Sequence, residues 1–534
     1  MTEPVQIVRR IGGNLAQALR WALARAILPR GRGLWISLRL APPLDEIAAP
    51  QLSLHPQPTL FEVLQILDAA GRDAGVDGIF VDLVGAPADW SRTQSLRRAL
   101  SRVRELGKPV VVWAERLDER GLLLASAATQ IWLPEAGQVF LLGVRAETFH
   151  LRDLLAHLDV RPEVVRIGSH KTAGEIFTRS SMSPEQREQL DALADAWFGA
   201  LVDGIAAGRG LEPERVRELI DRGPYTAPAA LAAGLVDACV YPDEIERRLD
   251  ALTPLPPAQR DGPRRAQRVD ARTVHALRGA DPRWRPLLCE IPRIAYVVAR
   301  GAIHRGSGSK GIACEALGAL LERVRRDESV RAVVLRIDSP GGDALASDLL
   351  WRAVSQLRRE KPVVASMAGV AASGGYYLAS AADAVLAESG TITGSIGVLG
   401  GKLNLEGLYR RLGVGRDGVE RGARAGLLSE ARTFRADERR ALRDEMSALY
   451  AMFVERVARG RGLSAEAVER VAQGRVWSGS RAAALGLVDG IGGPLEALAK
   501  ARSLAGLARD RVRVTLHPRH ARLPTLAALL RNAR

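Results

Sequence analysis

The chain of 534 residues has few cysteines and few aromatic residues. Its three cysteines, Cys239, Cys289 and Cys314, are too few for a disulfide framework and too widely spaced for a zinc site with closely spaced ligands. We therefore expect a reducing compartment and neither a metal nor a cofactor. Aromatic residues make up 4% of the chain, which leaves few rings for stacking on the bases of a single-stranded nucleic acid.

Lysine is also rare in this chain. Only six of the 76 basic residues are lysines, and the other 70 are arginines. The formal net charge of +15 would by itself fit binding to nucleic acid or to an anionic membrane. The arginines are spread along the whole chain, however, without a motif typical of nucleic-acid-binding domains. We expect no nucleic-acid partner, and each lysine becomes a candidate for a role that arginine cannot fill.

The chain also lacks a long uncharged apolar run at its start, because residues 5–29 are interrupted by Arg9, Arg10, Arg20 and Arg25. A spanning helix needs about 20 consecutive apolar residues, so we expect no bilayer span there. Apolar residues between the arginines recur at helical spacing, which fits a helix on an anionic membrane surface or a helix capping the first domain. The segment by itself leaves both attachment to a membrane surface and a purely structural role open.

The most informative feature is an internal repeat. Residues from Val76 match residues from Val330 at an offset of 254, and similar matches continue through both copies, near 60–250 and near 313–503. Each copy alternates strands and helices, with short apolar runs typical of buried parallel strands. The pattern predicts an α/β fold made of two tandem repeats with parallel sheets and crossover helices.

The repeat divides the chain into five parts. They are an N-terminal amphipathic helical segment (1–45), the first repeat (46–252), a Pro- and Arg-rich connecting segment (253–291), the second repeat (292–510) and a basic C-terminal tail (511–534).

Differences between the copies point to chemistry in one of them. The second copy has a Ser-Gly-Gly turn at Ser373 where the first has Glu119, and Gly341 where the first has Pro87, which lacks a backbone N–H. Taken singly, such glycine-containing turns are more often ordinary turns without a functional role. Together they offer what acyl transfer needs, a serine on a strand-to-helix turn and N–H groups for an oxyanion. The candidates are Ser373 as nucleophile and Gly374, Gly341 and Gly342 as oxyanion donors.

The base for this serine is harder to assign. His304 and His275 lie near the start of the second copy, but neither sits in a motif that forms a Ser-His-Asp triad. A lysine kept neutral by desolvation is the alternative. Lys171 stands out because its counterpart in the second copy is Ala425. The first copy thus carries a lysine that the second lacks, and the second a serine that the first lacks, which predicts one composite site.

Four motifs resemble those of the S49 signal peptide peptidases, in the long form that contains two tandem copies. They are HKTAGEIFTRSSMSP (His170–Pro184), IDSPGG (Ile337–Gly342), AASGGYY (Ala371–Tyr377) and TGSIGV (Thr393–Val398). The resemblance covers roughly residues 60–505. It implies a ClpP/crotonase-like fold, a membrane-associated homotetramer, and a Ser-Lys dyad that cuts hydrophobic peptides such as cleaved signal peptides through an acyl-enzyme.

By this resemblance Ser373 is the nucleophile and Lys171 the general base. Gly374 and the Gly341-Gly342 turn match the oxyanion region, and Ser395 matches a serine that orients the lysine in short-form relatives. The chain departs from the family in His170, where relatives often have an aromatic residue, and in the arginines of its N-terminal segment, where the long form usually has a membrane anchor. From the resemblance and this departure we predict peripheral or inner-membrane association in a bacterium, with a soluble cytoplasmic enzyme as the alternative. Two alternatives stay open, a non-catalytic membrane-associated scaffold of protease fold and a crotonase-type acyl-CoA enzyme, which would share the fold without needing the serine and lysine.

Overall fold

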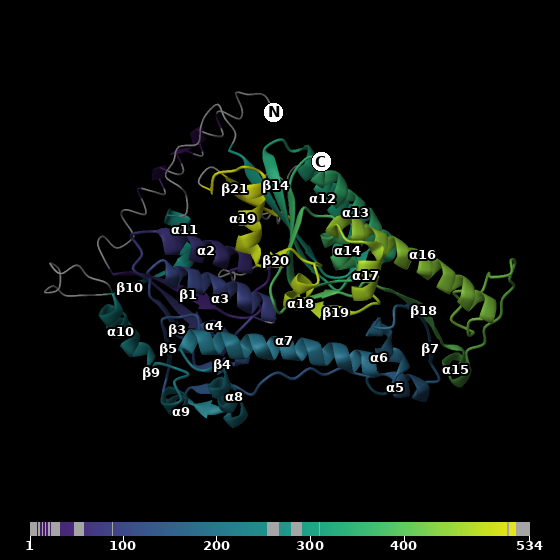
Figure 1. The fold of residues 1–534 in the computed structure, drawn as a ribbon, viewed down its shortest axis with the longest axis horizontal. Helices are drawn as coiled ribbons and strands as arrows, with labels where there is room; N and C mark the ends of the chain where they lie inside the picture. Colours follow the sequence, from purple (N-terminus) through teal and green to yellow (C-terminus); the bar gives the residue numbers. More distant parts are fainter. Residues whose placement is uncertain are drawn as a thin grey trace.

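Two units of similar architecture make up most of the structure, a computed structural model (Figure 1). It describes residues 33–46, 58–87, 89–253, 266–278, 291–308, 310–509 and 512–518, with single positions between 8 and 22. Of the predicted N-terminal helix, Val8, Ile11, Leu15 and Leu19 are helical and exposed, and most of its other residues lie outside the described part.

The first copy is built on a six-stranded parallel sheet. Its four central strands are short, largely apolar runs and are mostly buried, whereas the two outermost strands are more exposed. In sheet order they are β10 (Gln267–Asp270), β1 (Leu34–Leu40), β2 (Gly78–Leu83), β3 (Val110–Trp113), β5 (Gln130–Leu133) and β9 (Ala238–Cys239). The helices are α2 (Leu60–Arg72), α3 (Trp90–Glu105), α4 (Glu119–Ala125), α7 (Pro184–Arg209), α8 (Pro213–Arg222), α9 (Ala227–Ala232), α10 (Ile245–Leu252) and α11 (Ala271–Arg278).

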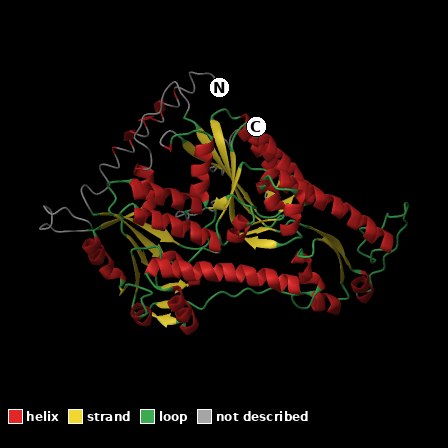
Figure 2. Ribbon diagram, in the orientation of Figure 1, coloured by secondary structure: helices red, strands yellow, loops and turns green. Residues whose placement is uncertain are grey.

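The second copy repeats this plan on an eight-stranded sheet, parallel except for one edge pair. The main path is β19 (Val476–Ser478), β17 (Ile392–Gly394), β15 (Val363–Ala372), β14 (Val330–Ser339), β11 (Arg293–Arg300) and β21 (Arg513–His517), with β16 (Ala384–Ala387) and β20 (Gly490–Ile491) beside β15. Its helices are α12 (Cys314–Arg326), α13 (Ala344–Arg358), α14 (Gly374–Ala379), α16 (Ala436–Arg461), α17 (Ala465–Val471), α18 (Gly479–Ala484) and α19 (Pro494–Leu504). Figure 2 shows helices packed around both sheets, and the predicted tandem α/β repeats are confirmed.

The ends of the two copies differ from the boundaries expected from the sequence. The predicted connecting segment contributes β10, which pairs with β1, and α11, which packs on α2. The predicted C-terminal tail likewise contributes β21, which pairs with β11. Each copy therefore closes its sheet with a strand from the segment that follows it. These strands have four and five residues, too short to give a periodic signal in the sequence.

Smaller elements complete the two units. A three-stranded sheet in the first copy contains β4 (Arg116–Asp118), β6 (Gln138–Phe140) and β8 (Tyr225–Thr226), and a two-stranded sheet in the second contains β12 (Ile303–His304) and β13 (Ile312–Ala313). Short helices are α5 (Arg152–His157), α6 (Glu175–Thr178), α15 (Glu406–Arg411) and the 3-10 turns η1 (Thr172–Gly174) and η2 (Pro242–Glu244).

A separate antiparallel strand pair joins the two copies beside the edge of the second sheet. Strand β7 (Arg161–Ile167) of the first copy pairs along its whole length with β18 (Val398–Asn404) of the second. Helix α7 runs from the first copy toward this pair, below β19 in the view of Figure 1, and packs against β19. The first copy therefore sends a strand and the start of its longest helix to the second copy's sheet edge.

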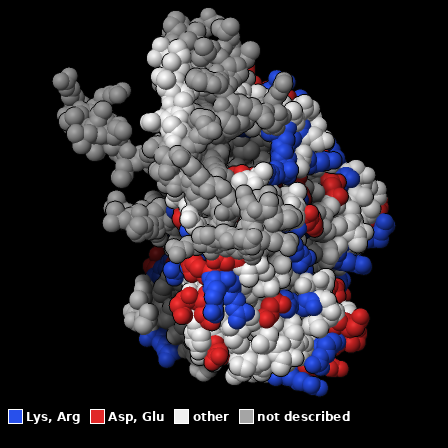
Figure 3. Space-filling view, turned by 90° about the vertical axis from the view of Figure 1, so that its left-hand side faces the viewer, with Lys and Arg blue, Asp and Glu red and all other residues white. Residues whose placement is uncertain are grey.

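The surface carries both signs of charge. On the described part of the face in Figure 3, Lys and Arg lie interspersed with Asp and Glu, and no field of one sign covers it. None of the helices in the described ranges is long and apolar enough to cross a membrane.

Candidate active site

Ser373 lies at the turn where β15 ends and α14 begins. Its backbone has φ 52° and ψ −120°, a conformation that residues other than glycine rarely adopt. Its N–H donates to the Gly394 carbonyl at 2.8 Å, which ties the turn to β17. A strained turn of this kind, held by its neighbours, is frequent where a side chain must be presented to a reactant.

Lys171 reaches this serine from the other copy of the same chain. Its Nζ lies 3.1 Å from Ser373 Oγ, 2.8 Å from the Ser395 carbonyl oxygen and 3.0 Å from Ser395 Oγ. The residue is 6% exposed, and this burial lowers the pKa of Lys171 from its ordinary 10.5 to about 8. Desolvation disfavours the ammonium form, so a large share of neutral amine is present slightly above neutral pH.

The β7–β18 pair explains how two residues so distant in sequence meet. Lys171 follows β7 by four residues, and Ser395 precedes β18 by three. Antiparallel pairing places the end of one strand beside the start of the other, and Ile167 pairs with Val398 at that point. Ser395 itself has φ 53°, and its N–H donates to the Arg475 carbonyl at 2.7 Å.

The predicted glycine turn packs directly against the serine. A Cβ placed on Gly341, which has φ +102°, would lie 2.8 Å from Ser373 Cβ and 2.7 Å from the Gly374 nitrogen, so only glycine fits there. The Gly341 N–H, however, donates to Ser339 Oγ at 3.1 Å. Gly341 is one of the three glycines predicted to donate an N–H to the oxyanion. Its N–H is instead engaged by a side chain of its own loop.

The two histidines considered from the sequence have other surroundings. His304 Nδ1 and Nε2 lie 2.9 and 2.5 Å from the carbonyl oxygens of Arg305 and Lys310. His275 lies on α11, which packs against α2 and β1 of the first copy. Of these candidates, the side chain that the fold places within hydrogen-bond distance of Ser373 Oγ is that of Lys171.

Comparison with known proteins shows which family the chain belongs to. The model of peptidase family S49 matches residues 102–255 and 355–508. The chain belongs to peptidase family S49. It is 32% identical over 453 residues to the chloroplastic serine protease SPPA of Arabidopsis thaliana, covering 84% of this chain and 66% of that protein. It is also 32% identical over 465 residues to protease 4 of Salmonella typhi, covering 84% of this chain and 72% of that protein.

These relatives and the family identify the chain as a serine protease. The chain spans about two thirds to three quarters of the length of the two relatives, at 66% and 72%. Among solved structures, a ClpP1 mutant from Listeria monocytogenes matches with 16% identity and a TM-score of 0.26, covering 38% of this chain and 94% of that one.

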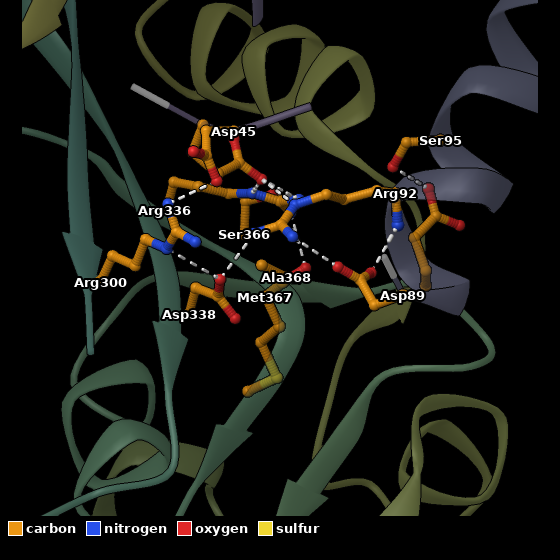
Figure 4. A network of polar contacts seen from close by, with 12 residues as sticks. Asp45, Asp89, Arg92, Ser95, Arg300, Arg336, Asp338, Ser366, Met367 and Ala368 are labelled. Carbon is orange, nitrogen blue, oxygen red and sulfur yellow. Dashed lines mark hydrogen bonds and ion pairs between the residues drawn. The ribbon is translucent and has the colours of Figure 1, made fainter. Parts of the chain in front are cut away.

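In this S49 peptidase a buried polar network joins the first copy to the strand that leads into the glycine turn (Figure 4). Arg336 of β14 is fully buried, and its Nε and Nη2 donate to Glu46 Oε1 of the first copy at 2.9 and 2.7 Å. Arg92 of α3 donates to Asp338 Oδ2 at 2.7 Å. Because Asp338 lies three residues before Gly341, the first copy also stabilises the glycine turn, to which it contributes no residue.

Several residues at this site carry no signal that sequence reasoning detected. Arg92 and Gln189 lie on helices with no motif around them, and Glu46 lies in a loop. Gly474 is recognisable only in the fold, since a Cβ on it would lie 2.5 Å from Lys171 Cα. A sequence pattern marks groups that react, whereas these residues matter through contacts with parts of the chain far away in sequence.

Proposed function

We propose that the protein is a Ser-Lys endopeptidase that cuts hydrophobic peptides, such as cleaved signal peptides, through an acyl-enzyme. The observation that carries this proposal is the 3.1 Å approach of the buried Lys171 amine to Ser373 Oγ. A nucleophile and a base within hydrogen-bond reach, with the base oriented by a third group, are the arrangement that nucleophilic acyl transfer requires.

Ser395 orients the base in this mechanism. A neutral lysine amine has two N–H groups and one lone pair. The carbonyl and hydroxyl oxygens of Ser395, at 2.8 and 3.0 Å, accept the two N–H groups. The lone pair is then directed to Ser373, where it accepts the hydroxyl proton as Oγ attacks the carbonyl carbon of the peptide. This is the role of lysine orienter expected from the family resemblance.

The developing oxyanion is stabilised by backbone N–H groups. Gly374 follows the nucleophile at the start of α14, where helix N–H groups have no partner within the helix. Gly342 supplies the second donor, since the Gly341 N–H is engaged by Ser339 Oγ. Gly341 itself serves by its lack of a side chain, which lets the turn approach Ser373.

The cycle closes without a cofactor. The Lys171 ammonium gives its proton to the leaving nitrogen as the C–N bond breaks, and the acyl group stays on Ser373 Oγ. A water molecule then attacks the ester, Lys171 takes up its proton, and Ser373 regains a proton as the acid is released. Apolar substrates are supported by Leu345 and Leu349, which are 53% and 51% exposed on α13 directly after the glycine turn.

The test is cleavage of a synthetic signal peptide from pH 6 to 10 by the wild type, Ser373→Ala and Lys171→Ala. Activity of the wild type should rise through one ionisation near pH 8, since burial lowers the pKa of Lys171 to about 8 and only the neutral amine is a base. Both variants should lose activity by about 1,000-fold or more while keeping the circular dichroism spectrum of the folded wild type.

Activity retained by Lys171→Ala would show that another group is the base. A wild type that cuts no peptide, and whose Ser373 is not labelled by a serine-reactive phosphonate, would favour the non-catalytic scaffold.

Assembly as a homotetramer is part of the same proposal. It is supported by large apolar side chains that are exposed around the β7–β18 pair, among them Phe149, Leu412, Val419 and Leu428 at 81%, 65%, 89% and 75%. Patches of this kind commonly mark protein contacts. Sedimentation velocity should give the mass of four chains, and a monomer at micromolar concentration would contradict it.

Peripheral membrane contact completes the proposal and rests on the exposed helical positions Val8, Leu15 and Leu19. Their apolar side chains, next to arginines in the sequence, suit an interface with anionic lipid. The protein should sediment with vesicles containing phosphatidylglycerol and not with phosphatidylcholine vesicles. Deletion of residues 1–29 should abolish this, and unchanged binding after deletion would locate the contact elsewhere.

A further inference from the structure

The segment that carries Lys171 is held by few backbone contacts of its own. It lies between β7 and the 3-10 turn η1, outside any strand or longer helix. The His170 N–H donates to the Gln473 carbonyl at 2.8 Å, and the Lys171 N–H donates to the Gly168 carbonyl at 3.2 Å. A base on such a segment needs further support if its amine is to stay in one place beside the nucleophile.

The side chain of Gln189 supplies contacts on both sides of the lysine. Gln189 lies on α7 and is 3% exposed. Its Nε2 donates to the His170 carbonyl at 3.2 Å and approaches Thr172 Oγ1 at 3.4 Å, so it contacts the residue before Lys171 and the residue after it. The same nitrogen donates to the Glu185 carbonyl of its own helix at 3.0 Å, which fixes the orientation of the amide.

The other end of the same amide contacts the nucleophile's copy. Gln189 Oε1 accepts the N–H of Val476 at 2.9 Å. Val476 belongs to β19, the edge strand of the second sheet, where an outward N–H has no neighbouring strand to bind. Strand β19 pairs with β17, and Gly394 of β17 accepts the Ser373 N–H. One buried side chain thus links the segment of the base to the sheet that holds the nucleophile.

We propose that Gln189 is a positioning residue of the peptidase, whose side-chain amide fixes the Lys171 segment against β19 and thereby sets where the lysine amine lies relative to Ser373. This rests on the proposed role of Lys171 as the base. Gln189 touches neither Ser373 nor the lysine amine among the contacts of the structure, so its effect on the reaction passes through the backbone of residues 170–172.

The amide is suited to this position because it has donors at one end and an acceptor at the other. Glutamate has the same shape but would direct a second oxygen at the oxygens of His170, Thr172 and Glu185. Methionine keeps the length and the apolar stem and removes both polar ends, which leaves the Val476 N–H without this partner. Either change loosens the Lys171 segment without touching the reacting groups.

Loosening the Lys171 segment would change the pH dependence of the activity in a particular way. Lys171 is neutral near pH 8 because it is desolvated, so a segment that lets water reach the amine raises its pKa toward 10.5. Activity is then lost mostly at neutral pH and regained at higher pH. A general loss of stability would instead lower activity by the same factor at every pH.

The experiment compares full-length wild type, Gln189→Met, Gln189→Glu and the matched control Asp195→Asn, an exposed residue of the same helix. kcat and KM for a hydrophobic fluorogenic peptide are measured from pH 6 to 10.5. For Gln189→Met we expect the midpoint of the basic rise to move up by about one unit, and kcat at pH 7.5 to fall about tenfold with KM little changed. The control should follow the wild type.

Gln189→Glu should shift the midpoint further, because a carboxylate near the lysine also favours its charged form. The neutral methionine variant therefore separates geometry from charge. If Gln189→Met melts below the assay temperature, the neutral variant Gln189→Leu, which also lacks both polar ends, decides the question.

An unchanged midpoint in the folded variants, with or without a uniform loss of amplitude, would overturn the positioning role. Failure of the proposed base is a different result. In that case Lys171→Ala would keep activity, or the wild type would lack a basic ionisation, whatever the Gln189 variants do. With Lys171→Ala inactive and Gln189→Met unshifted, only the positioning role fails.

Discussion

The two copies share structural contacts but differ in the serine and the lysine that the proposed mechanism uses. In the first copy Arg209 and Asp237 form a bidentate ion pair with N···O distances of 2.7 and 2.8 Å. In the second copy Arg461 and Asp489 form the same kind of pair, at 2.6 and 2.8 Å. Each aspartate also accepts a backbone N–H of its own sheet. Such contacts are needed once per sheet and so persist in both copies, whereas one reaction needs only one serine and one lysine.

The turn before the short central helix shows what the division changes. In the first copy Asp118 begins α4 with an ordinary extended backbone, and its side chain accepts the Gly121 N–H at 2.7 Å. In the second copy Ser373 begins α14 with φ 52° and caps no N–H with its side chain. The first turn is therefore built for stability, and the second gives up a helix cap to expose a hydroxyl group.

The largest expected effect concerns the kind of basic residue at the site. Lys171→Arg keeps the positive charge in a chain that otherwise prefers arginine, but a guanidinium has a pKa above about 12 and cannot act as a base. We expect kcat to fall by about 1,000-fold or more at every pH from 6 to 10, with Lys361→Arg as the structural control. Substantial activity in Lys171→Arg would mean that the copies do not divide the chemistry as proposed.

The next effect concerns matching positions of β14 and β2. Arg336 is fully buried on Glu46, whereas Asp82, its counterpart in the first copy, forms a looser pair with the largely exposed Arg39. Arg336→Met leaves the buried Glu46 with only the longer, 3.9 Å ion pair to Arg92 and should lower the free energy of unfolding by about 3–5 kcal/mol. Asp82→Asn should change it by about 0–1 kcal/mol.

Urea denaturation measures both of these variants. If the two variants lost equal free energy of unfolding, the buried pair of Arg336 with Glu46 would contribute no more to stability than the more exposed pair of Arg39 with Asp82.

A smaller effect shows the cost of keeping a buried lysine. Between pH 8 and 10.5 the unfolded chain holds a proton on Lys171 that the folded chain does not, so wild-type stability rises with pH in this window. Lys171→Met lacks this rise. It should be more stable than the wild type by about 1–3 kcal/mol at pH 7, and the gain should vanish above about pH 10.5.

The comparison needs unfolding curves of both proteins at pH 7 and 10.5. A variant that is no more stable at pH 7, or a difference independent of pH, would argue against a desolvated amine. Lys361→Met should show a smaller pH-dependent gain, because burial also lowers the pKa of Lys361, whose amine binds the carbonyl oxygens of Val324 and Asp327 at the end of α12.

The smallest effect should be the same in both copies. Gly210 and Gly462 end the two long helices with φ 64° and 63°, and a Cβ on either would meet nothing within 4 Å. Substitution by alanine therefore costs only the strain of a left-handed backbone, about 1 kcal/mol at each site. Melting temperatures of the two variants should fall together, and a clearly larger fall in one would mean that its helix end has an additional role.

Much of this architecture could be predicted from the sequence, because duplication makes local patterns visible twice. The buried strands and the turn at Ser373 follow from apolar runs and glycine pairs, and Lys171 from its absence in the other copy. The short strands β10 and β21 could not be predicted, since they form only by pairing with β1 and β11. The turned-back N–H of Gly341 also escaped prediction, because a motif names a residue without giving the direction of its N–H.

The sequence by itself determined the two repeats, the Ser-Gly-Gly turn that only the second copy has, and Lys171, which has no lysine counterpart in the second copy. It did not determine whether the two groups belong to one site of one chain, because they are 202 residues apart and no local periodicity connects them. The tertiary structure decided this through the pairing of β7 with β18 and the packing of α7 on β19. Contacts of this range depend on how whole elements dock, so they become visible only once the chain is folded.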